Sequence, residues 1–201
     1  MNIIDIGLVF TSPLIKRKKT DKIILHHTAW QNATVEQIHN DAINNNGWLG
    51  IGYHIYVRYD GNVFQGRPLD TVGAHCSGQN STTIGVAFEG NYECLDKEMP
   101  QAQYNAGIEV LKYIKSIYGD LPIYGHKDFY NTVCPGRWFP LADFQAMKGG
   151  EDVAKWYDEV MEWAQSEGLI EGDERGLRPE DNITRAEAVT IIKKVVDKYC
   201  K

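Results

Sequence analysis

Short apolar runs of strand length alternate with longer amphipathic stretches along the first part of this 201-residue chain, and no other feature constrains its fold as strongly. The helix expected over residues 34–46 begins with a capping box formed by Thr34 and Gln37. A second helix, expected over residues 100–119, opens with a proline and closes with a glycine. The runs expected to form buried strands are residues 22–26, 84–88 and 122–124.

One hairpin interrupts this alternation. Residues 53–59 alternate in polarity, Asp60 and Gly61 form a strong turn signal, and Val63 begins the return strand. A hairpin adds an antiparallel pair to strands that are otherwise joined through helices. We therefore expect an α/β fold of the mixed α+β kind, with a central mixed sheet flanked by helices and the functional residues on loops at strand ends.

A change of composition indicates a domain boundary at residues 148–150. Beyond it, residues 151–201 hold 13 Asp and Glu against 8 Lys and Arg, which accounts for most of the net charge of -6. An apolar helical stripe there ends at Gly168, and a second capping box begins at Thr184. The sequence predicts a first domain over residues 1–148 and a small all-α module of two helices over residues 151–201.

Charge and hydropathy argue against several classes of partner. The net charge of -6 disfavours a nucleic-acid binder, whose affinity would come from a basic face. No apolar run approaches the ~20 residues that span a bilayer, so no membrane partner is expected. The basic residues 16–19 follow the apolar residues 1–10, which is the reverse of a secretory signal, so we expect a protein made in the cytoplasm without a signal peptide. Its four cysteines are widely spaced and are expected to be mostly free thiols.

Three residues with metal-binding chemistry stand at expected strand ends and turns. His26 ends the first strand, His126 follows the last one, and Cys134 lies in the next loop. Two nitrogens and a thiolate suit Zn²⁺, and a catalytic zinc leaves its fourth position to a water whose pKa falls to roughly 7. A pair of histidines or a Cys-Pro step alone is more often structural. A zinc site is predicted because these features occur together in one chain.

Five segments within residues 20–140 resemble the N-acetylmuramoyl-L-alanine amidases of the peptidoglycan recognition protein and T7 lysozyme type; in order they read "IILHHTA", "WLGIGYHIYVRYDGNVFQGRP", "VGAHCSGQNSTTIGVAFEGNY", "GHKDF" and "TVCPG". In that family the first His of the pair, the His of "GH" and the Cys of "CPG" bind zinc. The resemblance implies one zinc ion per chain, held by His26, His126 and Cys134. It also implies hydrolysis of the amide bond between N-acetylmuramic acid and L-alanine in peptidoglycan.

The resemblance implies two further catalytic residues. The tyrosine of "GYH" is Tyr53, which could position the water or share the proton transfer, and the position two residues before the cysteine is Thr132. Some relatives have a lysine at that second position and others a threonine. The hydroxyl of Thr132 could donate a hydrogen bond to the oxyanion that develops at the carbonyl.

Five other residues are candidate substrate contacts. His27 follows His26 in a strand and so faces the opposite side, which makes it a neighbour of the metal rather than a ligand. The resemblance places His75 and Asn80 in the region that lines the substrate groove of relatives. The remaining candidates for this groove are Arg67 and Trp48.

The second domain resembles an S-layer homology repeat, a module that binds secondary cell-wall polymers. Its "TRAE" motif begins at Thr184, and the family's polymer contact corresponds to Arg185, whose guanidinium suits a carboxylate. Such repeats commonly occur in threes, whereas one copy of about 50 residues has a marginal core. The module is therefore expected to dock on the first domain or to form a homo-oligomer.

Together these features predict a peptidoglycan amidase that acts at the bacterial cell wall after release, as a phage endolysin does. A bacterial autolysin exported by another route is an open alternative. Two other functions are also open alternatives. A non-catalytic peptidoglycan-binding protein would usually lack the cysteine ligand, and a Cys-His peptidase would use Cys134 and His126 without a metal.

Overall fold

A computed structural model describes residues 1–148, 163–170 and 185–199 of the chain. The chain forms two compact units, Met1–Gly150 and Glu151–Lys201, and each is described by itself. Within the described residues, no helix combines the length and the apolar character needed to cross a membrane.

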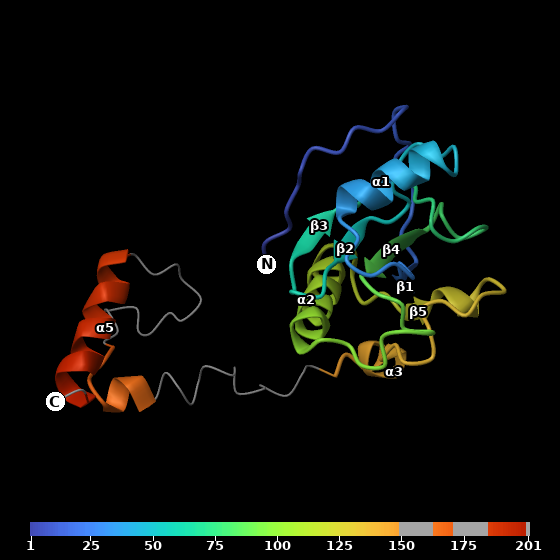
Figure 1. Cartoon of the computed structure of the whole chain (residues 1–201). Helices are drawn as coiled ribbons and strands as arrows, with labels where there is room; N and C mark the ends of the chain where they lie inside the picture. Colours follow the sequence, from blue (N-terminus) through green and yellow to red (C-terminus); the bar gives the residue numbers. More distant parts are fainter. Residues whose placement is uncertain (149–162, 171–184, 200–201) are drawn as a thin grey trace. The chain divides into compact units, whose positions relative to one another are not determined.

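The first unit is built on one five-stranded sheet with the strand order β3-β2-β4-β1-β5 (Figure 1). β1 pairs in parallel with β4 and β5, β2 pairs in parallel with β4, and β2 and β3 form the antiparallel hairpin. The predicted mixed sheet is thereby confirmed. The strands are β1 Lys22–His27, β2 Ile55–Val57, β3 Val63–Gln65, β4 Thr83–Phe88 and β5 Ile123–Gly125.

The predicted helices are present at nearly the expected bounds. α1 is Val35–Asn44, and the predicted capping box is formed: the Thr34 hydroxyl accepts the Gln37 amide at 3.2 Å and the Gln37 side chain accepts the Thr34 amide at 2.8 Å. α2 is Gln101–Tyr118 and ends at Gly119. Two short helices were not predicted, the 3-10 turn η1 His126–Asp128 and α3 Leu141–Gln145.

Helices cover both faces of the sheet (Figure 1). Leu25, Val86 and Ile55 belong to the larger core on the face covered by α2 and α3, and Phe144 of α3 is fully buried there. Ala87 and Tyr56, their strand neighbours, point to the opposite face. The strands are thus buried on both faces, which explains their nearly continuous apolar sequence.

The first strand of the hairpin is shorter than predicted. The expected strand over residues 53–59 is reduced to Ile55–Val57, and the backbone just before it contacts another loop. Gly52 lies so close to Ala74 that a Cβ added there would be 2.1 Å from the Ala74 carbonyl oxygen. Tyr53 therefore lies in the approach to the strand rather than in its ladder.

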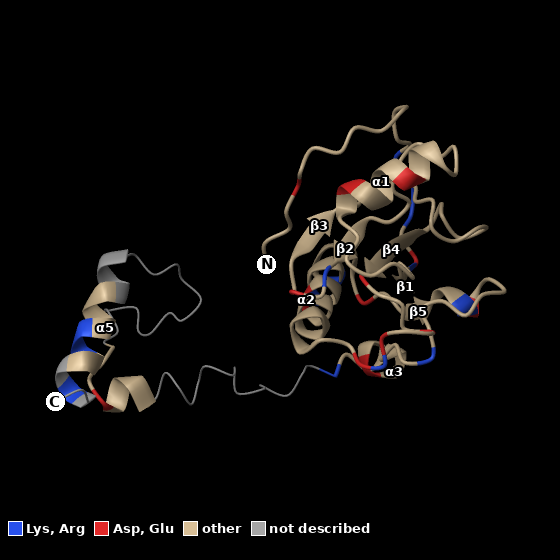
Figure 2. Cartoon of the chain, in the orientation of Figure 1, with Lys and Arg blue, Asp and Glu red and all other residues tan. Residues whose placement is uncertain are grey.

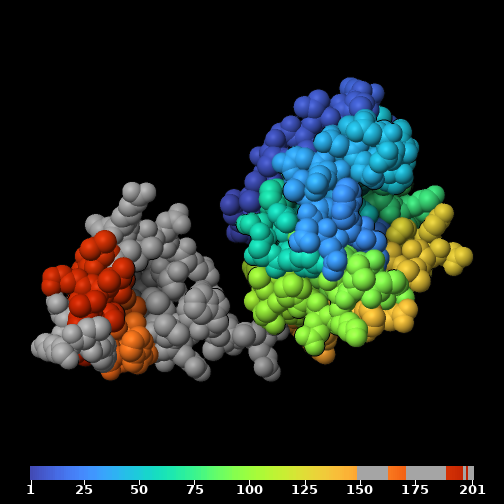
Figure 3. Space-filling model, viewed as in Figure 1, coloured from blue at the N-terminus to red at the C-terminus, as the bar shows by residue number. Residues whose placement is uncertain are grey.

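The first twenty residues run along the outside of the sheet, an arrangement that the sequence pattern did not predict. Ile4 bridges Phe64 of β3, and the Thr11 amide donates to the Leu49 carbonyl at 3.0 Å. In the space-filling view this dark-blue segment lies against α1 and β3 (Figure 3). The segment covers the edge strand of the sheet, where unpaired backbone groups would otherwise be exposed.

In the second unit, residues 163–166 are helical and α5 is Arg185–Tyr199. The predicted end of the first helix is observed at Gly168, which has a φ of 68°, and the Leu169 amide donates to the Ala164 carbonyl at 2.8 Å. Most of the first expected helix and the Thr184 capping box lie outside the described residues. Figure 2 marks the acidic and basic residues, which are interspersed over the elements of the first unit.

Candidate metal centre

The ends of two neighbouring parallel strands bring two histidines together. β1 and β5 pair in a register that places Leu25 opposite Gly125. The next residues, His26 and His126, therefore leave this pairing side by side, and their ring centroids are 4.6 Å apart. The pairing and register of β1 and β5 thus account for the meeting of two residues that are far apart in the sequence.

Cys134 reaches the same point from the loop after η1. The Lys127 amide donates to the Cys134 carbonyl at 2.9 Å and holds this loop against η1. One potential ligand atom from each of His26, His126 and Cys134 lies within 4.8 Å of the others. The structure thus brings the three predicted metal ligands together.

The atoms of this cluster fit a tetrahedral zinc ion. His26 Nδ1 is 3.8 Å from the Cys134 Sγ. Zinc–nitrogen and zinc–sulfur bonds of ordinary length would separate such a pair by about 3.6 Å in a tetrahedral arrangement. Two imidazoles and one thiol leave one position of that arrangement for a water or a substrate oxygen.

Burial sets the protonation of the cluster. It lowers the pKa of His26 well below its usual value, and the neighbouring His75 and His126 lower it further. Burial also lowers the pKa of His126 and raises that of the Cys134 thiol to about 12. The imidazoles are therefore neutral, as metal ligands must be, whereas the thiolate needs a nearby cation to form.

The two candidate catalytic hydroxyls lie close to this cluster. The half-buried ring of Tyr53 has its centroid 5.1 Å from that of His26, and burial raises its pKa, so its hydroxyl stays protonated. The Thr132 oxygen accepts the Cys134 amide at 3.2 Å. The hydrogen of that hydroxyl remains available for a bond to substrate.

His75 and Asn80 lie behind the cluster. His75 is buried, and its Nδ1 is 3.0 Å from the His26 Nε2. The Asn80 side chain accepts the backbone amides of His75 and Cys76 at 2.8 and 2.9 Å. Both side chains thus have structural partners here, and their expected contact with substrate stays a prediction.

His27 is buried on the side of the strand opposite to His26. Its Nδ1 accepts the Tyr92 amide at 3.0 Å, and its carbonyl oxygen is 3.9 Å from the Cys134 Sγ. Burial lowers its pKa, against an opposing effect of Glu93. His27 thus lies on the face where the strand alternation placed it, next to the candidate metal ligands, and its expected contact with substrate stays a prediction.

The other predicted binding residues differ in accessibility. Arg67 is buried and donates to the backbone carbonyls of Ile51 at 2.8 Å and Val72 at 2.9 Å, which gives it a structural task. Trp48 is 49% exposed. Arg185 begins α5, and its side chain lies outside the described residues. Their roles toward substrate or polymer stay predictions.

Tyr130 is a neighbour of the cluster that the sequence did not single out. Its ring stacks on His126 with centroids 5.6 Å apart and an angle of 23°, and 54% of the residue is exposed. Its amide donates to the His126 carbonyl at 3.1 Å. The spacing of four residues from a candidate ligand histidine is the signal that could have identified it.

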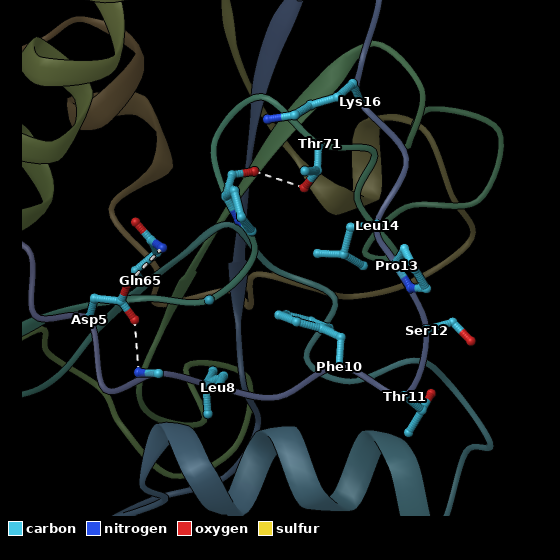
Figure 4. A pocket seen from close by; sticks show the side chains of 13 residues that line it. Asp5, Leu8, Phe10, Thr11, Ser12, Pro13, Leu14, Lys16, Gln65 and Thr71 are labelled. Atoms are coloured by element: carbon cyan, nitrogen blue, oxygen red, sulfur yellow. Dashed lines mark hydrogen bonds between the residues drawn. The ribbon is translucent and has the colours of Figure 1, made fainter.

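A hollow of about 670 Å³ lies away from these ligands, between the N-terminal segment and the β3 region (Figure 4). Phe10 and Leu14 point into it from the segment. Its remaining lining includes Gln65 and Thr71 but none of the three ligands. It is therefore separate from the candidate metal centre.

Residues 16–137 match the family described as N-acetylmuramoyl-L-alanine amidase, and residues 151–189 match the S-layer homology domain. An endolysin of Klebsiella phage KP32 is 33% identical over 138 residues, which cover 62% of this chain and 88% of that protein. The peptidoglycan-recognition protein SC2 of Drosophila melanogaster is 33% identical over 127 residues, which cover 56% of this chain and 66% of that protein.

A solved structure agrees with these sequence matches. The N-acetylmuramoyl-L-alanine amidase LysC from Clostridium intestinale superimposes with a TM-score of 0.69 at 33% identity, over 73% of this chain and 96% of that one. The matched family region contains every element that carries the candidate ligands.

Proposed function

Because the chain belongs to the N-acetylmuramoyl-L-alanine amidase family, we propose that it hydrolyses the amide bond between N-acetylmuramic acid and the first L-alanine of the peptidoglycan peptide. One observation carries the proposal most directly. Within the matched region, potential ligand atoms of His26, His126 and Cys134 lie within 4.8 Å of one another. This is the donor set of a catalytic zinc site with one open position.

We assign the zinc to His26 Nδ1, a ring nitrogen of His126 and the Cys134 thiolate. Bound there, zinc supplies a Lewis acid for the amide carbonyl and a water whose pKa is lowered to about 7. Neutral imidazoles are ready to bind it without losing a proton, and the thiol releases one.

The two hydroxyls then act on the substrate. Tyr53 keeps its proton because burial raises its pKa, so it donates a hydrogen bond at the reacting carbonyl or to the attacking water. Thr132 is fixed by the Cys134 amide and directs its own hydrogen toward the developing oxyanion. The attacking water is the source both of the oxygen added to the carbonyl carbon and of the proton that the released amine of L-alanine takes up.

The same residues fit a Cys-His peptidase less well than a zinc amidase. A nucleophilic cysteine works as a thiolate and needs an electropositive, partly exposed setting that lowers its pKa. Cys134 is 8% exposed, and burial raises its pKa to about 12. A cysteine in these surroundings is suited to bind a metal cation rather than to attack a carbonyl.

We assign the targeting of the enzyme to residues 151–201, in line with their S-layer homology match. In this proposal Arg185 binds an anionic substituent of a secondary cell-wall polymer, and the enzyme is an endolysin that reaches the wall after release from the cytoplasm. Self-association through this module is tested by the solution mass of the chain with and without it.

The bond that is cleaved can be identified by mass spectrometry of purified peptidoglycan digested with the full chain. The proposal predicts intact glycan strands and peptides with a new amine on L-alanine. New reducing sugar ends, or cleavage between two amino acids, would contradict it.

A further inference from the structure

The sheet leaves a space for an imidazole directly behind a metal ligand. Thr83, Gly85 and Ala87 point to one face of β4, and Ala87 is paired with His26 of β1. Gly85 has no side chain, and the ring of His75 occupies that position. A Cβ added to Gly85 would be 2.5 Å from the His75 Cγ.

A second glycine also leaves room for this ring. A Cβ added to Gly73 would be 2.5 Å from the His75 Cδ2 and 2.9 Å from the His54 Cε1. His54 also contacts the His75 ring edge to face, with centroids 5.7 Å apart. The imidazole of His75 is thus held by backbone and by a neighbouring ring, so its orientation is fixed.

In this orientation His75 links two hydrogen bonds. Its Nδ1 is 3.0 Å from the His26 Nε2, and its Nε2 is 3.2 Å from the Thr83 Oγ1. The Thr83 hydroxyl donates to the Gln79 carbonyl at 2.9 Å. That last bond has a known direction because a carbonyl oxygen only accepts.

Metal binding fixes which group donates and which accepts in each hydrogen bond from His26 to Gln79. A metal on His26 Nδ1 leaves the ring proton on Nε2, which then donates to His75 Nδ1. His75 carries its proton on Nε2 and donates to Thr83, which donates to Gln79. Each group therefore has one proton and one acceptor, in one consistent order.

We propose that His75 is a positioning residue of the metal centre, which holds the proton of His26 on Nε2 and so keeps Nδ1 directed at the metal. The inference rests on the proposed zinc site. His75 cannot bind the same ion, because it lies at the nitrogen of His26 opposite to the one that faces Cys134. Groups that orient a ligand histidine commonly contribute about 10- to 100-fold to metal affinity.

Thr83 offers the cleanest test, because valine has its shape and also favours strands but lacks the hydroxyl. We expect Thr83→Val in the full chain to weaken zinc binding about 10-fold in competition with a chelator, and Thr83→Ser to bind as tightly as the unaltered chain. His75→Ala should weaken zinc binding about 10- to 100-fold. The control is His39→Ala, a buried histidine whose Nε2 bonds the Val9 carbonyl, and it should leave zinc affinity unchanged.

A second readout reports the proton positions directly. Nitrogen NMR of the zinc-loaded chain should place the ring protons of His26 and His75 on Nε2. Unchanged zinc affinity in Thr83→Val, or a proton on His75 Nδ1, would overturn the inference. Failure of the proposed function is a separate outcome, since it would appear as absence of zinc binding or of amide cleavage in the unaltered chain.

Discussion

Removal of the Tyr53 hydroxyl, a single oxygen atom at the metal centre, should reduce catalysis while leaving the stability of the fold nearly unchanged. Tyr53→Phe keeps the half-buried ring that lies 5.1 Å from His26 and deletes only the hydroxyl. No hydrogen bond of this hydroxyl is found among the described residues, so its removal leaves no orphaned group there. The free energy of unfolding should therefore change by less than about 1 kcal/mol.

Turnover should respond far more strongly. One positioned acid-base group contributes about 10²- to 10⁴-fold to a rate, which corresponds to about 3–5 kcal/mol of transition-state stabilisation. The assay is the release of L-alanine amines from solubilised muropeptides, with zinc content measured on the same sample. Since burial raises the pKa of Tyr53, its loss should not alter the pH profile near neutrality.

Tyr56→Phe is the matched control. Its hydroxyl is buried and donates to the Ala33 carbonyl at 2.7 Å, so this variant should lose about 1–3 kcal/mol of stability and keep its turnover. Thermal denaturation distinguishes the two, at about 2–4 °C per kcal/mol for a domain of this size. An unchanged rate in zinc-loaded Tyr53→Phe would refute the catalytic role and assign this tyrosine to packing.

Three further predictions concern the metal, the pH response and the second unit. Cys134→Ser should lose zinc and activity while circular dichroism reports an intact fold, because no described neighbour offers a replacement thiolate within the cluster. Burial lowers the pKa of His54 to about 3, so below about pH 6.5 the unfolded chain binds a proton that the folded chain does not. Its contribution should lower the free energy of unfolding by about 1.4 kcal/mol per pH unit between about pH 6 and 4, and His54→Gln should flatten this slope in chelator-treated samples. A chain ending at Lys148 should keep zinc and cleave soluble muropeptide but sediment poorly with purified walls, and Arg185→Ala should reproduce the wall-binding defect alone. Equal sedimentation of the truncated and full chains would remove the targeting role.

Local sequence signals predicted the elements that frame the site. The capping box at Thr34 and the glycine at position 119 placed both long helices, and the Asp60-Gly61 turn placed the hairpin. The family and the fold class are confirmed, and the relatives support the predicted amidase activity. These features depend on residues that are close together in the sequence or on a motif with fixed spacing.

Features that depend on long-range packing were not predictable. The backbone before the short hairpin strand meets another loop at Gly52 and Ala74, and the first twenty residues carry no periodic pattern although they cover the β3 edge. The position of His75 behind His26 depends on a space left by Gly73 and Gly85. No local sequence pattern predicts the orientation of the His75 ring.

The metal dependence of the reaction tests the central claim most directly. We expect the purified full chain to contain about one zinc per chain, to lose amide cleavage when a chelator removes the metal, and to regain it when zinc is returned. Full cleavage of the amide bond to L-alanine by a verified metal-free sample would contradict this account and favour a thiol mechanism at Cys134.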